Sequence, residues 1–414
     1  MTVLERMTSQ EAIALEDRYG AHNYHPLPVV LHKGEGVYVW DVEGKKYYDF
    51  LSAYSAVNQG HCHPKIVGAM VNQAQTLTLT SRAFYNDQLG PYEKYLTAYF
   101  GFDKVLPMNT GAEAVETAIK LCRKWAYEKK GIAEQEAQII VCEGNFHGRT
   151  TTIISFSNDA SARKNFGPYT PGFIKIPYDD TAALERVLSS SDNIAGFLVE
   201  PIQGEAGVYV PHEGYLAKAK ALCEQHNVLF IADEVQTGIA RTGKLLAVQH
   251  ENVTPDILVL GKALSGGVYP VSAVLANNHI MDVIKPGQHG STFGGNPIAA
   301  AVAVAALEVV KDEKLAENAV YLGNLFREKL GEYVKSSNIV TLVRGKGLLN
   351  AIVINDTEDS STAWDICMAL RDNGLLAKPT HGNIIRFAPP LVMTEAQLLD
   401  CVSIITKTLQ QFER

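Results

Sequence analysis

The chain has 414 residues, of which 46% are hydrophobic and 20% charged, and its formal net charge is −8. This composition predicts a soluble globular protein of two or three domains with room for a full hydrophobic core. Nucleic-acid-binding proteins usually carry a basic surface, whereas this acidic chain has no cluster of five basic residues. We therefore expect no nucleic-acid partner.

The first twenty residues carry four acidic residues against two arginines. Transit peptides are rich in arginine and poor in acids, and signal peptides have an apolar core. The longest apolar run, residues 298–307, is much shorter than the roughly 20 residues that cross a bilayer. We expect a cytoplasmic protein that does not cross a membrane.

The first sixty residues are typical of turns and short strands, with alternating apolar positions on either side of a "DVEGK" turn. From about Asn109 to Ala276, short apolar strands alternate with amphipathic helices, which indicates a mostly parallel α/β sheet covered on both faces. The expected helices include 112–129 and 214–226. The expected strands are 139–142, 196–199, 228–232, 257–260 and 271–276.

A long helical tract is predicted from Pro297 to about Lys335, and we expect it to connect the sheet to a smaller C-terminal domain. The tail then returns to strands with helices between them, which is an α+β pattern. The predicted organisation is an N-terminal segment (1–60) packing with the small domain, a large domain (61–308) and a C-terminal small domain (309–414).

The six cysteines are scattered and never form a CxxC pair, which argues against a disulfide framework or a zinc finger and favours a reducing compartment. The run His61-Cys62-His63 could suggest a metal. Adjacent residues rarely converge on one ion, and Pro64 is typical of a helix start. We predict no metal site.

Each expected strand of the sheet ends in polar or glycine-rich sequence, and ligands of open α/β sheets bind outside the carboxyl ends of the strands. Lys262 follows the apolar run "DILVLG" and is the most informative of these residues. It could be an ordinary lysine reaching the surface. Alternatively, withdrawal from water would lower its pKa and make it a nucleophile able to condense with an aldehyde.

Asp233 ends the strand "VLFIAD", 29 residues before Lys262. It is either a solvated acid at the sheet edge or a buried partner for a cation. Pyridoxal phosphate needs a carboxylate at its ring nitrogen, because the protonated pyridine withdraws electrons from the substrate. Neighbouring strand ends could thus hold such a ring from opposite sides.

Thr110 and Gly111 precede a helix with an apolar face, so free backbone N–H groups and the positive helix end could bind a phosphate. An ordinary capping box, Thr110 with Glu113, fits the same residues. Phe146 could stack on a ring or only pack in the core, and Gln236 could reach a ring hydroxyl. Further candidate phosphate donors are Ser291 and Thr292 of "STFGGNP".

Two nucleotide-binding patterns are incomplete. Residues 238–245, "GIARTGKL", nearly match a phosphate-binding loop, but Leu245 stands where a metal-binding hydroxyl is needed and no strand can precede the loop. The fragment "GKGLLN" (345–350) lacks the last glycine of the dinucleotide fingerprint and its βαβ context. Neither pattern predicts a nucleotide enzyme.

The ordered motifs NTGAEA, NFHGRT, EPIQGEAG, IADEVQTG, LGKALSGG, STFGGNP and RFAPPL resemble the class III aminotransferases of pyridoxal-phosphate fold type I. The resemblance runs from about residue 18 to the end, and residues 19–30, 54–67 and 370–390 are most similar to the ornithine-specific members. It implies an α/β fold in which a mostly parallel seven-stranded sheet is flanked by helices beside a smaller α+β domain. It also implies pyridoxal 5'-phosphate as the cofactor and a homodimer with shared active sites.

The resemblance assigns roles to single residues. Lys262 would hold the cofactor, Asp233 would bind the ring nitrogen, and Thr292 would reach the phosphate bound in the neighbouring subunit. His147 stands where the resemblance predicts tryptophan. The full implied cofactor set is Thr110, Gly111, Ala112, Phe146, His147, Asp233, Val235, Gln236, Lys262, Ser291 and Thr292.

The resemblance also implies the substrates L-ornithine and 2-oxoglutarate. Arg149 would clamp the α-carboxylate of ornithine, with Tyr24 and Tyr54 at the α-amino end, so that the δ-amine faces the cofactor. Arg386 would bind the second carboxylate of 2-oxoglutarate, and Glu205 would neutralise it while ornithine is bound. Alternatives are an N-acetylornithine or 4-aminobutyrate aminotransferase, or a catalytically silent scaffold, which the intact Lys262 and Asp233 pair argues against.

Overall fold

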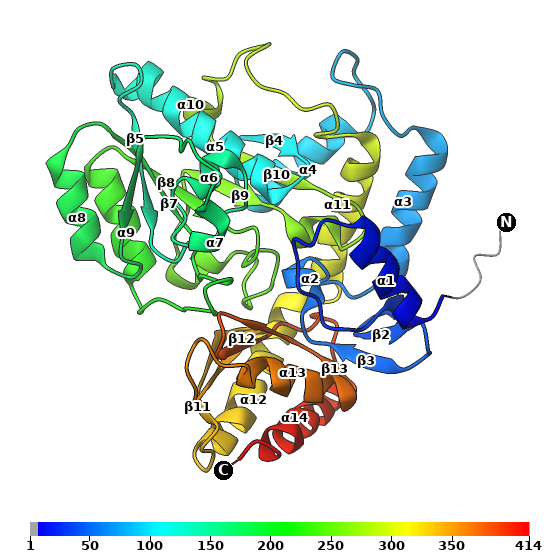
Figure 1. Cartoon of the computed structure of the whole chain (residues 1–414). Helices are drawn as coiled ribbons and strands as arrows, with labels where there is room; N and C mark the ends of the chain where they lie inside the picture. The colour runs from blue at the N-terminus through cyan, green and yellow to red at the C-terminus, as the bar shows by residue number, and fades with distance from the viewer. Residues whose placement is uncertain (1–6, 414) are drawn as a thin grey trace.

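The computed structural model describes residues 7–413, so the first six residues of the predicted N-terminal segment and Arg414 lie outside the description. Its centre is a seven-stranded sheet in the order β4-β10-β9-β8-β7-β5-β6 (Figure 1). Strand β10 runs antiparallel to both neighbours, and the other strands are parallel to one another. The strands are β4 (Lys104–Met108), β5 (Gln138–Cys142), β6 (Phe173–Ile176), β7 (Ile194–Val199), β8 (Leu229–Asp233), β9 (Ile257–Leu260) and β10 (Ser272–Ala276).

Apolar residues cover both faces of this sheet, as the continuous apolar runs predicted. All residues of β7, β8, β9 and β10 are buried, and alternate residues belong to two hydrophobic clusters. Helix α5 covers one face, and α8 and α9 lie over the other. The helices of this part are α3 (Pro64–Thr76), α4 (Leu89–Phe100), α5 (Gly111–Trp125), α6 (Thr151–Ile154), α7 (Ala160–Arg163), α8 (Thr181–Ser190), α9 (Tyr215–Gln225), α10 (Asn278–Met281) and α11 (Pro297–Asp312).

The C-terminal part carries a four-stranded antiparallel sheet in the order β11-β12-β15-β14. A third sheet, β1-β2-β3-β13, joins N-terminal strands to the short C-terminal strand β13, which pairs in parallel with β3. The strands are β1 (Leu31–Glu35), β2 (Tyr38–Asp41), β3 (Lys46–Asp49), β11 (Val340–Lys346), β12 (Leu349–Ile354), β13 (Leu375–Leu376), β14 (Lys378–Thr380) and β15 (Ile384–Phe387). The helices are α1 (Ser9–Tyr19), α2 (Ser52–Ser55), α12 (Leu315–Val334), α13 (Thr362–Asp372) and α14 (Glu395–Gln410).

The predicted fold class is confirmed, with two corrections to its elements. The helical tract from Pro297 is not one helix, because Lys314 adopts a left-handed conformation with φ of +51° and separates α11 from α12. Helix α1 lies in the N-terminal segment, where the sequence predicted only turns and strands. Its capping box of Thr8 and Glu11 is the local signal for it. The domain boundaries at 60 and 308 stay a proposal.

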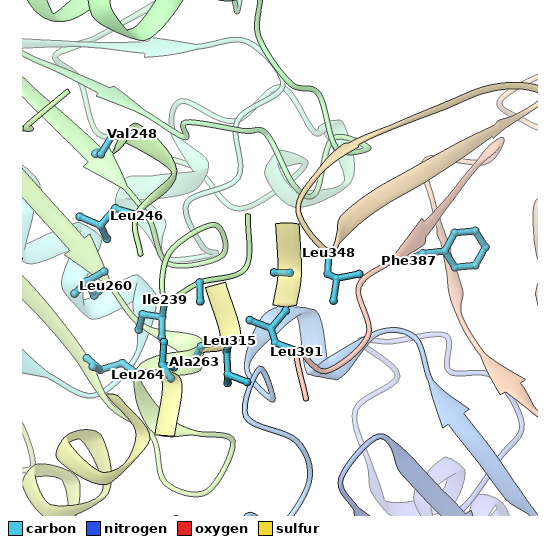
Figure 2. Close-up of a cluster of buried hydrophobic side chains, with 14 of the residues drawn as sticks. Ile239, Leu246, Val248, Leu260, Ala263, Leu264, Leu315, Leu348, Phe387 and Leu391 are labelled. Carbon is cyan, nitrogen blue, oxygen red and sulfur yellow. The ribbon is translucent and has the colours of Figure 1, made fainter. Parts of the chain in front are cut away.

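A continuous hydrophobic cluster joins the large sheet to the small one. Figure 2 shows Ile239, Leu260 and Leu264 on the large-sheet side, with Leu315 and Leu348 beyond them toward the small sheet. All five side chains are buried. Burial of apolar surface stabilises the junction by roughly 1.5–3 kcal/mol for each large side chain. The turn that follows β9 is therefore held between the two parts of the chain.

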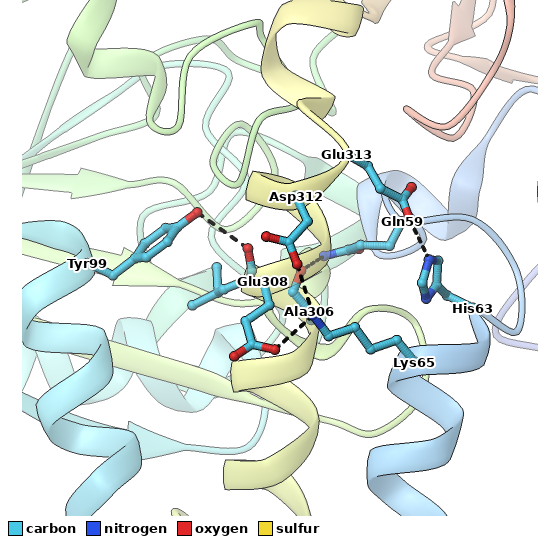
Figure 3. Close-up of polar contacts among 9 residues, drawn as sticks. Gln59, His63, Lys65, Tyr99, Ala306, Glu308, Asp312 and Glu313 are labelled. Atoms are coloured by element: carbon cyan, nitrogen blue, oxygen red, sulfur yellow. Dashed lines mark hydrogen bonds and ion pairs between the residues drawn. The ribbon is translucent and has the colours of Figure 1, made fainter.

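Polar contacts fix helix α11 against α3, against the segment before α3 and against α4 (Figure 3). Lys65 lies 2.9 Å from Glu308 and 3.0 Å from Asp312, and the exposed fraction of these side chains limits the strength of each pair. Gln59 is buried, and its amide nitrogen donates to Ala306 O at 3.2 Å and to Ala263 O at 2.9 Å. Gln59 therefore ties α11 to the residue that follows Lys262.

The histidines of the His61-Cys62-His63 run point to different elements. His61 Nε2 lies 2.7 Å from Asp49 on β3, and His63 Nε2 lies 2.8 Å from Glu313 after α11. No helix within residues 7–413 has the length and apolar character needed to cross a bilayer.

Candidate active site

The carboxyl ends of β5, β7, β8 and β9 surround a cavity of about 170 Å³. Parallel strands end at the same edge of a sheet, so polar residues that follow them gather there. The structure thus brings together most of the residues that the strand ends predicted. The cavity is lined by Gly111, Ala112, Phe146, His147, Gly148, Glu200, Asp233, Val235, Gln236, Thr237 and Lys262.

Lys262 begins a 3₁₀ turn directly after β9 and has a left-handed φ of +41°. A non-glycine residue rarely takes this conformation, and such strain is typical of functional positions. Burial, together with the positive charge of Arg386, lowers the pKa of the Lys262 amine to about 8. The charges of Glu205 and Asp233 oppose this effect only in part. A substantial fraction of this amine is therefore neutral near physiological pH.

Asp233 is buried at the end of β8 and forms an ion pair with His147. His147 Nδ1 lies 2.7 Å from Asp233 Oδ2, and the Val235 backbone N–H donates to Asp233 Oδ1 at 3.0 Å. Burial acts to lower the pKa of His147, but the hydrogen bond and charge of Asp233 outweigh it and raise the pKa above its ordinary value. The carboxylate is thus oriented from two sides.

Glu200 directly follows β7, and the sequence assigned no role to it. Its carboxylate accepts hydrogen bonds from the backbone N–H groups of Phe146 at 2.9 Å and Gly204 at 3.4 Å. Burial raises the pKa of this carboxyl to about 7. Glu200 therefore positions Phe146 and the loop that carries Glu205, and its place directly after Val199 at a strand end was the signal for it.

The end of the cavity near Gly111 and Ala112 is formed by the N-terminus of α5. Thr110 makes the predicted capping box, since its hydroxyl accepts from Glu113 N at 3.2 Å while the Glu113 carboxylate accepts from Thr110 N at 2.9 Å. A Cβ on Gly111 would come within 2.8 Å of Val235, so glycine is needed for this close approach. The backbone amides of this first turn remain suited to an anion.

Ser291 and Thr292 lie outside the lining of this cavity. The Ser291 hydroxyl is 2.9 Å from Asn109 Nδ2 and accepts from Gly294 N at 3.0 Å. Thr292 is exposed. These two residues are therefore not gathered with the other predicted cofactor residues within the single described chain.

Arg386 lies on β15, and the fold brings it to the edge of the cavity. Its guanidinium is buried, lies 3.1 Å from the Glu205 carboxylate and donates to Gln236 Oε1 at 3.0 Å. It also stacks over the ring of Tyr54, 4.7 Å from the ring centroid. Burial, together with the charge of Glu205, raises the pKa of Tyr54 above its ordinary value. These four residues form one connected group.

Arg149 and Tyr24 lie toward the outside of the site. The Arg149 side chain is 59% exposed, lies 5.8 Å from the ring centroid of Phe146, and pairs loosely with Asp159 at 3.7 Å. Tyr24 is exposed. Both remain available to a substrate.

A family model described as "Aminotransferase class-III" matches residues 19–409. The chain belongs to the class III aminotransferases. A curated relative from Drosophila melanogaster, named ornithine aminotransferase, mitochondrial, is 63% identical over 401 residues, which cover 97% of this chain and 92% of the relative.

Solved structures of class III aminotransferases have the same fold. The ornithine aminotransferase from Toxoplasma gondii superposes with a TM-score of 0.95 at 51% identity, covering 98% of this chain and 96% of that one. A structure from Elizabethkingia anophelis, described as an acetylornithine aminotransferase, has a TM-score of 0.91 at 69% identity and covers 98% of this chain and 100% of that one. The two structures carry different substrate names, so the substrate has to be argued from the site.

Class III aminotransferases use pyridoxal phosphate, and the residues of the cavity fit this cofactor. Lys262 offers an amine of lowered pKa, and Asp233 offers a buried carboxylate whose partner His147 stands beside it. The first turn of α5 offers an anion site at the opposite end. Lys262, Asp233 and the first turn of α5 therefore match, in this order, the aldehyde, the protonated ring nitrogen and the phosphate of the cofactor.

Proposed function

We propose that this aminotransferase moves the δ-amino group of L-ornithine to 2-oxoglutarate in two half-reactions, giving glutamate 5-semialdehyde and glutamate. The semialdehyde cyclises to pyrroline-5-carboxylate. The observation that carries the proposal is the pair of Glu205 and Arg386, 3.1 Å apart beside Lys262. The names of the curated relatives support it. When bound, pyridoxal phosphate supplies the aldehyde that accepts the amino group and the protonated ring that withdraws electrons.

Lys262 Nζ is the group that moves the proton of the substrate carbon. A general acid or base works best when its pKa is close to the working pH, and the pKa of about 8 places Lys262 there. Asp233, oriented by His147, would offer its carboxylate to a protonated ring nitrogen. Phe146 lines the cavity and supplies a face against which a flat ring can stack.

Glu205 and Arg386 act as a switch between the two substrates. Ornithine has one carboxylate and two amines, so an unpaired Arg386 would attract the wrong end of the molecule. The Glu205 carboxylate cancels that charge while ornithine is bound. 2-Oxoglutarate carries a second carboxylate, which takes the place of Glu205 and binds the guanidinium in a bidentate manner.

The predicted substrate contacts set the direction of ornithine. Arg149 binds the α-carboxylate, and Tyr24 and Tyr54 surround the α-amine. The distal δ-amine then faces Lys262. The exposure of Arg149 and the contact of Tyr54 with Arg386 support this orientation.

The deciding experiment is a single half-reaction with ornithine and no oxo-acid, followed by the absorbance of the bound cofactor. The wild type should convert one cofactor per site. Glu205→Gln should lose about tenfold or more of the rate with ornithine, because a buried charge is left uncompensated, while glutamate remains a good donor. Equal losses with ornithine and glutamate would contradict the switch.

Tyr54→Ile should open the α-amino end of the site. We expect ornithine turnover to fall by about tenfold and simple ω-amines to become relatively better substrates. A panel of kcat/KM values for ornithine and unsubstituted diamines measures this. An unchanged preference would remove Tyr54 from the specificity argument.

The alternative is an N-acetylornithine aminotransferase, the name that the Elizabethkingia anophelis structure carries, or a 4-aminobutyrate aminotransferase. The names of the curated relatives do not favour it. Acetylation removes the charge of the α-amine, so the polar tyrosines would have no cation to bind. Comparison of kcat/KM for ornithine, N-acetylornithine and 4-aminobutyrate decides between them. A higher value for N-acetylornithine would replace the first proposal.

The enzyme is proposed to work as a homodimer in which Thr292 reaches the phosphate site of the neighbouring subunit. The exposure of Thr292 and of Phe293 beside it supports this. Co-expression of Lys262→Ala with Thr292→Glu chains tests it, because one site of each hybrid dimer keeps both wild-type residues. Each variant alone should be inactive, and the co-expressed mixture should recover activity. If the mixture is as inactive as the two single variants, the shared site is contradicted.

A cytoplasmic location stays a proposal, supported by six free cysteines within the described residues. Some curated relatives are named mitochondrial. Cell fractionation with compartment markers is the measurement, and co-sedimentation with organelles would contradict it.

A further inference from the structure

A second cavity, of about 850 Å³, lies where the large-sheet part of the chain meets α12 and the β11–β12 hairpin. One wall is the segment 242–245, which belongs to the phosphate-loop-like pattern "GIARTGKL". Figure 2 shows the apolar cluster beside it, with Ile239 and Leu246 facing Leu315 and Leu348. The cavity is lined by Thr242, Gly243, Lys244, Leu245, His250, Ala316, Glu317, Val320, Asn324, Arg327, Gly345, Lys346 and Gly347.

The lining carries three basic side chains, Lys244, Arg327 and Lys346, against one carboxylate, Glu317. Within residues 7–413 neither lysine forms an ion pair, and the Arg327 guanidinium donates only to neutral oxygens, among them Gly347 O at 2.8 Å. The whole chain has a net charge of −8. Uncompensated positive charge gathered at one cavity of an acidic protein favours an anionic ligand.

The ammonium groups of Lys244 and Lys346 both act electrostatically on His250, which lines the same cavity. Its Nε2 lies 3.0 Å from Thr242 O. Burial lowers the pKa of His250, and the charges of Lys346 and Lys244 lower it further. The ring is therefore harder to protonate than an exposed imidazole, and the positive charge of the site comes from the two lysines and Arg327.

The walls of the cavity pack closely against one another, which makes it a preformed site. A Cβ on Gly347 would lie 2.3 Å from the Thr242 carbonyl carbon, and a Cβ on Gly243 would lie 2.4 Å from the Val320 side chain. Gly347 has a φ of +55° and Gly243 a φ of +93°, which glycine adopts without strain. A ligand therefore has to order few residues of the cavity when it binds.

We propose that this cavity binds a compact polyanion, carrying phosphate or carboxylate groups, between Lys244 on one side and Lys346 and Arg327 on the other. A phosphate-binding loop uses a hydroxyl to hold the metal of a metal–nucleotide complex, and Leu245 stands at that position. The anion therefore binds without a nucleotide-bound metal. Thr237 lines the active site and Thr242 lines this cavity on the same segment. A bound anion joins the two parts of the chain and stabilises the arrangement that places Arg386 beside Lys262.

Isothermal titration calorimetry of the holoenzyme tests the proposal with pyrophosphate and citrate as probes and acetate as the monovalent control. At least one polyanion should bind and acetate should not. The double variant Lys244→Gln/Lys346→Gln should weaken binding by at least about tenfold, because each charged hydrogen bond contributes a large share of the affinity. The matched control is Lys407→Gln, an exposed lysine on α14, which should bind like the wild type.

The two probes distinguish the chemical source of the ligand. Binding of pyrophosphate alone indicates a phosphate-bearing ligand, and binding of citrate alone indicates a polycarboxylate. The proposal is overturned if neither probe binds at millimolar concentration, or if the double variant binds both like the wild type. If 2-oxoglutarate abolishes the binding of a probe and the double variant retains this binding, the probe binds in the active site. That result would also overturn the proposal.

Discussion

His147 stands where the family resemblance predicts a tryptophan, and its side chain has a definite structural consequence. Its Nδ1 lies 2.7 Å from Asp233, so the imidazole provides a charge-assisted hydrogen bond to the carboxylate that faces the cofactor site. Phe156 packs beside the ring, with 6.0 Å between the ring centroids. The substitution therefore changes how Asp233 is supported and leaves the carboxylate in place.

The lowered pKa of Lys262 can be measured without the reaction. Competitive acetylation of the cofactor-free chain across pH 6–10 should give Lys262 a midpoint near its pKa of about 8. An ordinary exposed lysine titrates at about 10.4. Mass spectrometry of the Lys262 peptide, with surface-lysine peptides as internal controls, checks this. A midpoint shared with the surface lysines would remove the basis for Lys262 as a neutral nucleophile.

At the scale of elements, helix α12 shows how close approach constrains sequence. Gly323 lies in its interior and faces the β11–β12 hairpin, where a Cβ would lie 1.9 Å from Gly347 O. Glycine weakens a helix by about 1 kcal/mol relative to alanine, so its presence here is explained by the hairpin. A Cβ on Gly331, in the same helix, would meet no atom of the described residues within 4 Å.

Gly323→Ala and Gly331→Ala form a matched pair. The first should lower the free energy of unfolding by about 1–3 kcal/mol, because the new methyl group collides with backbone. The second should raise it by about 0.5–1 kcal/mol, because alanine favours the helix. Urea denaturation of both variants measures the difference. Equal effects would contradict the contact between α12 and the hairpin.

At the scale of the whole molecule, two buried carboxyls, Glu200 and Glu234, make stability depend on pH. Burial raises the pKa of each to about 7. Glu234 also holds the segment 237–248, since it bonds to the Thr237 hydroxyl and accepts from Val248 N at 2.8 Å. Because the folded chain binds these protons more tightly than the unfolded chain, their contribution is full below about pH 4.5 and is lost as pH rises through 7.

Glu234→Gln isolates this contribution. The wild type, freed of cofactor, should lose about 1–3 kcal/mol more stability than Glu234→Gln between pH 5 and pH 7.5. Thermal unfolding at both pH values measures it. Glu213→Gln, at an exposed position before α9, is the control and should follow the wild type. Parallel curves for wild type and Glu234→Gln would contradict a raised pKa in the folded state.

Local patterns in the sequence were sufficient for the five central strands of the large sheet and for the position of Lys262 and Asp233 at the ends of two of them. Apolar runs bounded by polar residues specify buried strands, and polar residues at their carboxyl ends must lie at one edge of the sheet. The break at Lys314 escaped this reasoning, because both flanking segments have helical composition and the break is a single backbone conformation. The edge strands β4 and β6 were also not among the expected strands.

The tertiary structure alone decided which distant residues meet. Glu205 and Arg386 are 181 residues apart, and His147 and Asp233 are 86 apart. The cations Lys244 and Lys346 share one cavity only because α12 and the β11–β12 hairpin pack against the large-sheet part. Hydrophobic periodicity is a property of neighbouring residues, whereas charge pairing across the chain depends on how finished elements pack.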